Sequence, residues 1–74
     1  MSTESRITLH AIVNGEARTL APGSTVLDLL HLLEIQPDRV AVEYNRAILK
    51  QPEWSRTRIA EGAQLEIVQF VGGG

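Results

Sequence analysis

A single stretch with helical periodicity lies between two groups of β-strand patterns, and this order limits the fold more than any other feature of the chain. The apolar residues that mark one helix stripe are Val26, Leu29, Leu30 and Leu33, and Leu27 and Leu32 are expected to widen it. Thr25 and Asp28 have the spacing of a capping box, which predicts that the helix begins here. Pro37 bars the helix from continuing, so we expect it to end near residues 34–36.

A β-hairpin is predicted before the helix. Apolar and polar residues alternate over residues 7–13, which is typical of a strand with one buried face. Asn14-Gly15 follows, and this dipeptide is the strongest short hairpin signal because both residues tolerate positive φ. Residues 16–20 then form the predicted return strand.

Three further strand patterns follow the helix, at residues 40–44, 48–49 and 65–71. Asn45-Arg46 is a candidate turn between the first two, although arginine resists positive φ. Pro52 has no backbone N–H to donate to a ladder, so residues 52–54 are expected to interrupt regular structure.

These elements predict an α+β fold. A crossover between parallel strands needs a dozen or more residues, and residues 21–39 supply enough. Placing the first and last strands side by side in the centre gives a β-grasp arrangement, in which one main helix packs across a mixed sheet of four to five strands. We expect residues 1–71 to form this domain and residues 72–74 to form a flexible glycine tail.

Composition excludes several classes of function. The chain has 74 residues, no cysteine and a formal net charge of −2 from seven basic and nine acidic residues. No basic stripe is present to neutralise phosphates, which argues against nucleic-acid binding. The apolar runs are too short to span a membrane. Residues 1–6 lack the apolar core of a signal peptide, so we expect a cytoplasmic protein.

The titratable residues form no recognisable catalytic or metal-binding motif. His10 and His31 both lie off the predicted apolar faces, and we expect them to be solvated. No second histidine or cysteine lies near either one at metal-ligand spacing, so we expect no metal site.

The most suggestive chemistry lies at the end of the sequence, Phe70-Val71-Gly72-Gly73-Gly74. Glycine has no Cβ, so the run is expected to form a thin tether that can enter a narrow active site. A free carboxylate on Gly74 would then be a suitable substrate for activation. The alternative is an ordinary loose chain end with no function.

The last predicted strand has two faces. Leu65 and Ile67 are the better candidates for the core, which would direct Val68 and Phe70 outwards. Exposed apolar side chains beside the tail would form a docking surface. Alternatively, Phe70 folds over the edge of the sheet.

Several segments together resemble the ThiS family of sulfur carriers in bacterial thiamine biosynthesis, which are ubiquitin-like β-grasp proteins. The segments are Asn14-Gly15, residues 22–26, 29–30 and 40–45, Trp54, and Gly62 leading to residues 68–74. The resemblance covers residues 7–74, nearly the whole chain. Their order and the terminal diglycine make it fairly specific.

The resemblance implies a mechanism in which the chain is a co-substrate and not an enzyme. An E1-like, ThiF-type enzyme would use ATP to adenylate the carboxylate of Gly74, and the chain itself would bind no cofactor. Sulfur from a partner persulfide would displace AMP to give a thiocarboxylate, which a ThiG-type thiazole synthase would accept. Gly73 completes the diglycine motif. Partner binding is implied for Val68, Phe70, Val71 and Gly72.

Three other functions stay open on sequence alone. The small subunit of molybdopterin synthase has the same fold and terminal chemistry, but its tail usually contains prolines, and residues 70–72 have none. A ubiquitin-like modifier would be conjugated to lysines through Gly74. A β-grasp interaction domain would have an inert tail.

Overall fold

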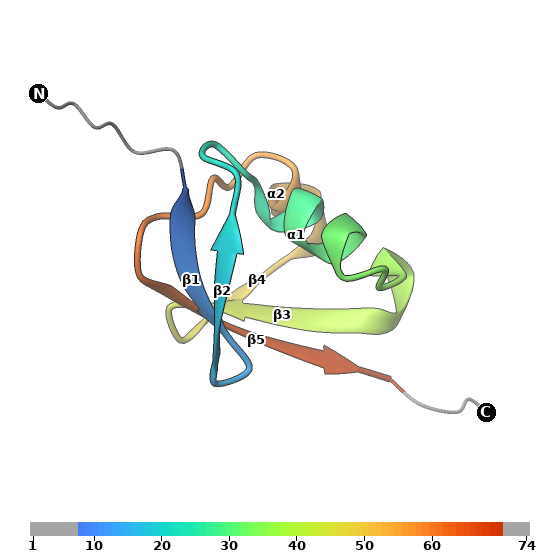
Figure 1. Cartoon of the computed structure of the whole chain (residues 1–74). Helices are drawn as coiled ribbons and strands as arrows, with labels where there is room; N and C mark the ends of the chain where they lie inside the picture. The colour runs from blue at the N-terminus through green and yellow to red at the C-terminus, as the bar shows by residue number, and fades with distance from the viewer. Residues whose placement is uncertain (1–7, 71–74) are drawn as a thin grey trace, which may run out of the picture.

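The computed structural model describes residues 8–70, which form one sheet with its helices packed on one side (Figure 1). The strands are β1 (Leu9–Val13), β2 (Glu16–Leu20), β3 (Val40–Tyr44), β4 (Ala47–Leu49) and β5 (Ala63–Gln69). The helices are α1 (Val26–Leu32), the 3₁₀ helix η1 (Pro37–Arg39) and the short α2 (Gln51–Trp54).

The sheet has the predicted mixed topology. Its five strands, counted within residues 8–70, lie in the order β2-β1-β5-β3-β4. β1 and β5 are parallel, and the other neighbouring pairs are antiparallel. The first and last strands therefore lie next to each other, with β5 at the centre of the sheet. This confirms the β-grasp prediction and its crossover through α1.

The helix α1 begins as the capping box predicted. The side-chain oxygen of Thr25 accepts from the backbone N–H of Asp28, and the Asp28 carboxylate accepts from the backbone N–H of Thr25. The helix stops at Leu32, and Glu34 then takes a left-handed conformation with φ of 59°. The prediction that Leu32 widens the buried stripe is wrong, because this side chain is 62% exposed.

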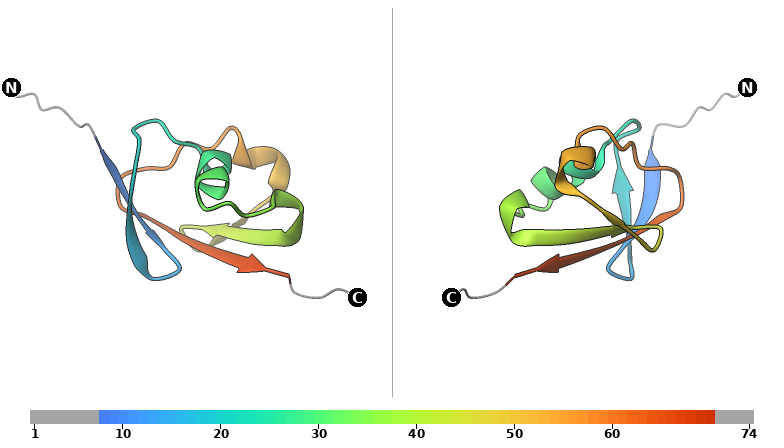
Figure 2. Two further views of the ribbon diagram at one scale, coloured as in Figure 1. Left: turned by 45° about the vertical axis from the view of Figure 1, so that its right-hand side comes forward. Right: turned by 180° about the vertical axis from the view of Figure 1, so that it is seen from behind.

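The buried apolar side chains of α1 and of the inner face of the sheet form one core. Figure 2 shows in two views that the helix runs across one face of the sheet. The largest fully buried side chains of the core are Leu29, Leu30, Leu65, Val26 and Val42. Every second residue of β1, and of β5 from Ala63 to Ile67, is buried in this core, which explains the alternating pattern in the sequence.

The region of Pro52 differs from the prediction. It forms α2 instead of an irregular segment, because proline in the first turn of a helix removes an N–H that would have no helical partner. Trp54 is buried at the end of α2, and its Nε1–H donates to the backbone oxygen of Leu49 at 2.8 Å. The short helix thus covers the β4 end of the core.

The last strand begins two residues earlier than predicted, at Ala63, and ends at Gln69. Val71 and the glycine tail lie outside the described residues, as do residues 1–7, so the predicted domain limits stay a prediction. Among residues 8–70, no helix has the length and apolar composition needed to cross a membrane.

Candidate functional site

The candidate site is the carboxyl end of β5, from which the chain continues towards Gly74. The described part of the chain ends at Phe70, so the predicted site residues Val71, Gly72, Gly73 and Gly74 lie outside it. Structure is therefore available for the strand that carries the tail and for the predicted docking residues Val68 and Phe70.

Val68 and Phe70 both expose their side chains. Ala63, Leu65 and Ile67 are buried on the inner face of β5, whereas Val68 is 57% exposed and Phe70 is 58% exposed. The outward orientation predicted for Val68 follows from this alternation. Phe70 does not fold over the edge of the sheet to become buried, so the exposed alternative is the one observed.

A third exposed apolar residue belongs to the same face. In the sheet register Glu43 lies opposite both Ile48 and Glu66, so these three side chains share one face of the sheet. Val68 follows Glu66 by two residues on β5, so Ile48 and Val68 both lie on the face that is turned away from α1. Ile48 is 67% exposed. We call Ile48, Val68 and Phe70 the outer patch. The acidic side chains of Glu43 and Glu66 lie between Ile48 and Val68, so this surface combines apolar groups with negative charge.

The position of β5 is held by asparagine side chains in the two hairpin turns. Asn14, with φ of 51°, donates through Nδ2 to the Ile67 oxygen at 3.1 Å and accepts through Oδ1 from the Ile67 N–H at 2.7 Å. On the other side of β5, the Asn45 backbone donates to the Gln64 oxygen at 2.7 Å. The Asn45 Oδ1 accepts from the Gln64 N–H at 2.9 Å. Each turn therefore continues the hydrogen bonding of the sheet onto β5.

The sequence pattern predicts the two turns but not this role of the asparagine side chains. Asparagine stands in the first position of both turns, and this is the sequence feature that could have indicated the bonds to β5. Its side-chain amide has the same donor and acceptor groups as a peptide bond. The ladder then extends past β5, because the Phe70 N–H donates to the Arg39 oxygen at 2.8 Å. The strand that carries the tail is thus bonded along both edges up to the outer patch.

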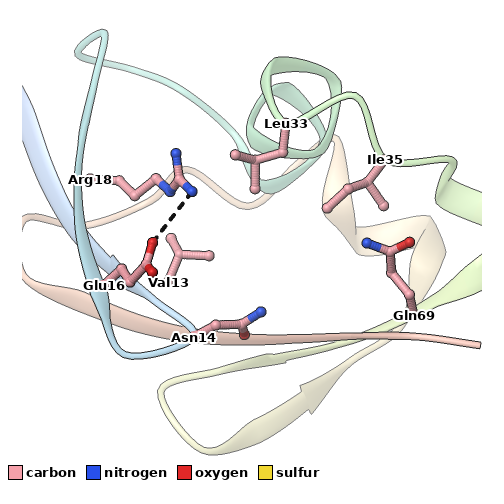
Figure 3. Close-up of a pocket in the computed structure, with 7 residues that line it drawn as sticks. All are labelled: Val13, Asn14, Glu16, Arg18, Leu33, Ile35 and Gln69. Carbon is pink, nitrogen blue, oxygen red and sulfur yellow. Dashed lines mark ion pairs between the residues drawn. The ribbon is translucent and has the colours of Figure 1, made fainter.

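A shallow groove of about 310 Å³ lies on the other side of the sheet (Figure 3). The β1–β2 hairpin contributes Glu16 and Arg18, the segment after α1 contributes Leu33 and Ile35, and the end of β5 contributes Gln69. Arg18 Nη2 lies 3.6 Å from Glu16 Oε1. The groove contains no arrangement of nucleophile and base, so its geometry is not that of a catalytic centre.

Among the titratable side chains of residues 8–70, Asp28 has a clear structural role in the capping box of α1. The backbone N–H of Thr25, and then its side chain, hydrogen-bond Asp28 and hold the pKa of that carboxyl below its ordinary value. His10 and His31 are both exposed, as expected, but His10 also contacts Glu61, with Nδ1 and Oε2 3.0 Å apart. No group of three potential metal ligands occurs within residues 8–70.

Comparison with known proteins identifies relatives of this chain. It is 38% identical over 66 residues to a thiazole synthase of Paramagnetospirillum magneticum, a match that covers 89% of this chain and 20% of that protein. It is 27% identical over 66 residues to sulfur carrier protein ThiS of Escherichia coli, covering 89% of this chain and all of that protein. The chain therefore spans about a fifth of the thiazole synthase and the whole of the carrier.

A solved structure has the same fold. The crystal structure of the thiamine biosynthesis protein ThiS from Geobacter metallireducens superposes with a TM-score of 0.76 at 32% identity, covering 89% of this chain and all of that one. The family model described as the ThiS family matches residues 11–74, which include the last three residues of β1, all of β2 to β5 and the glycine run. Sequence and fold agree over nearly the whole chain, and the protein belongs to the ThiS family.

Proposed function

We propose that this protein is a sulfur carrier in thiamine biosynthesis and that Gly74 is its reacting residue. The observation that carries the proposal is the placement of β5. This central strand is hydrogen-bonded on both sides and ends at Gln69, five residues before Gly74 in the sequence, with the side chains of Val68 and Phe70 exposed. Family membership supports the same function and the role of a co-substrate in place of an enzyme.

The chemistry begins with a carboxylate that is a poor electrophile. An E1-like, ThiF-type enzyme would transfer AMP from ATP to the Gly74 carboxylate and release pyrophosphate. A persulfide on a donor protein would then attack the carbonyl carbon and displace AMP. Cleavage of the resulting disulfide by a thiol would leave a thiocarboxylate on Gly74. Because the chain has no cysteine, both sulfur atoms in that disulfide would come from a partner.

The outer patch is the proposed docking surface for these partners. Apolar side chains that stay exposed on a small domain are typical of protein interaction sites. Val68 and Phe70 would contact the partner while Val71, Gly72 and Gly73 carry the terminal carboxylate into its active site. We propose a ThiG-type thiazole synthase as the sulfur acceptor. Support comes from the similarity of this chain to a fifth of a protein named thiazole synthase.

The experiment is a mass measurement on the protein purified with its natural carboxyl terminus. After incubation with the adenylating enzyme, ATP, a persulfide donor and a thiol, we expect a species heavier by the difference between sulfur and oxygen, mapped to Gly74. A variant that lacks Gly73 and Gly74 is the matched control, and it should stay unmodified. The partner enzymes are first shown to modify another ThiS protein. If they then leave the mass of this protein unchanged, the proposal is contradicted. A natural protein that continues past Gly74 would also contradict it.

A further inference from the structure

The strand β2 has an open edge. It lies at the border of the sheet and pairs with β1 alone among the strands of residues 8–70 (Figure 1). Its first four residues, Glu16 to Thr19, are all exposed. An open strand edge presents unpaired backbone groups that can receive another strand.

The free backbone groups of β2 belong to alternate residues. Val13 and Glu16 close the two-residue turn, and such a closing pair exchanges both of its hydrogen bonds. Since bonded and non-bonded pairs alternate along an antiparallel ladder, Arg18 also bonds towards β1. The N–H and C=O groups of Ala17 and Thr19 then point away from β1, towards the open side.

The charged side chains of β2 lie together on one face. Glu16 and Arg18 are two residues apart, so both project to the side of the sheet that carries α1. Their side chains are 75% and 43% exposed, and the separation of 3.6 Å makes them a loose ion pair (Figure 3). Both charges are thus available to a second partner.

We propose that two copies of this protein associate through β2, antiparallel, about a two-fold axis at Ala17. In this register Ala17 faces Ala17 of the second copy, so the free N–H and C=O groups of each meet those of the other. Glu16 then lies opposite Arg18 of the second copy, and Arg18 lies opposite its Glu16. The two-fold axis makes both charge pairs at once.

The charges select this register over its neighbours. A two-fold axis at Arg18 would place the two Arg18 side chains opposite each other. A two-fold axis at Glu16 would place the two Glu16 carboxylates opposite each other. Like charges directly opposite each other destabilise a strand pair. Charged residues on an edge strand commonly prevent association. In this chain, however, Glu16 and Arg18 lie two residues apart, so each meets the opposite charge of the second copy when the axis lies at Ala17.

The association leaves the candidate functional site accessible. β1 lies between β2 and β5, and the outer patch lies on β4, on β5 and at Phe70. Such a dimer would present two copies of that site on one ten-stranded sheet. The inference rests on β2 alone and does not depend on the sulfur-carrier chemistry.

The test is sedimentation equilibrium of the whole protein from micromolar to millimolar concentration. We expect the average mass to rise with concentration towards that of two chains. Glu16→Arg, which makes the face wholly positive, and Arg18→Glu, which makes it wholly negative, should each weaken association by about tenfold or more. An equimolar mixture of the two variants should recover it, because each then meets the opposite charge.

Two measurements keep the result interpretable. All three proteins should have similar thermal midpoints, because the altered side chains are exposed. Ala17→Pro removes an N–H that the hairpin does not use and should also prevent association. A wild-type mass of one chain at every concentration would overturn the proposal. So would single variants that associate like wild type, or a mixture that fails to associate.

Discussion

The side chain of Asn14 forms two hydrogen bonds with the backbone of Ile67, a residue 53 positions further along the chain. One bond is donated by the amide nitrogen and the other is accepted by the amide oxygen, so the side chain behaves like a strand residue that faces β5. The first hairpin therefore fixes the strand that leads to Phe70 and the tail.

The contribution of these bonds can be measured with Asn14→Gly. Glycine keeps the positive φ of the turn but removes both side-chain bonds. Leaving the part-buried Ile67 groups without these partners should lower the free energy of unfolding by about 1–3 kcal/mol. Denaturant unfolding measures this value. A Gly variant as stable as wild type would show that the turn conformation is all that Asn14 provides.

The second turn offers a matched pair of substitutions. Asn45-Arg46 adopts φ values of 50° and 73°, close to the 51° and 83° of Asn14-Gly15. A left-handed conformation costs a residue with a side chain about 1–2 kcal/mol, and the flexibility of glycine in the unfolded chain offsets part of this. Arg46→Gly should therefore stabilise the protein by about 0.5–1 kcal/mol.

Gly15→Ala is the reverse substitution in the first turn, and it should destabilise the protein. A Cβ at Gly15 would meet no atom within 4 Å, so its effect would arise from backbone strain and not from a clash. Denaturant unfolding of both variants gives the comparison. Equal shifts of the same sign for Arg46→Gly and Gly15→Ala would contradict this explanation.

Phe70→Ala should weaken binding to the proposed adenylating enzyme by about tenfold, because we propose that this apolar side chain lies in the docking interface. The thermal midpoint should change little, because Phe70 is 58% exposed. Leu32→Ala is the control, since Leu32 is similarly exposed on α1, away from the outer patch. Titration calorimetry measures the affinities. Equal losses for both variants, or a large fall in midpoint for Phe70→Ala, would refute the docking role.

The capping box should make part of the stability depend on pH. The pKa of Asp28 is lowered from its ordinary 3.8, chiefly by the hydrogen bond from the Thr25 backbone. A carboxyl with a lower pKa in the folded state stabilises the protein above its unfolded pKa. This contribution is lost as the pH falls from the ordinary pKa of the unfolded chain through the lowered pKa of the folded protein.

Asp28→Asn removes the charge and isolates this effect. Thermal midpoints of wild type and Asp28→Asn should differ near neutral pH and converge in acid, below the lowered pKa of Asp28. Parallel curves for the two proteins throughout the acid range would show that Asp28 is not the source.

Several features followed from the sequence because their causes are local. The period of apolar residues distinguishes α1 from β1 and β5, and Thr25 with Asp28 defines the start of the helix. Asn14-Gly15 predicts a turn because each residue tolerates the required φ. The glycine tail could be recognised as a potential site from its chemistry alone. Such signals act within a few residues, so they can be read along the chain.

Other features were decided only by the tertiary structure. Whether Leu32 is buried depends on which edge of α1 the sheet covers, and whether Phe70 is exposed depends on the face of β5 that α1 leaves open. The bonds from Asn14 to Ile67 join distant segments, so no local pattern contains them. Sequence determined the helix and strand elements, while packing determined the exposed faces, because burial and long-range hydrogen bonds exist only once the strands are assembled.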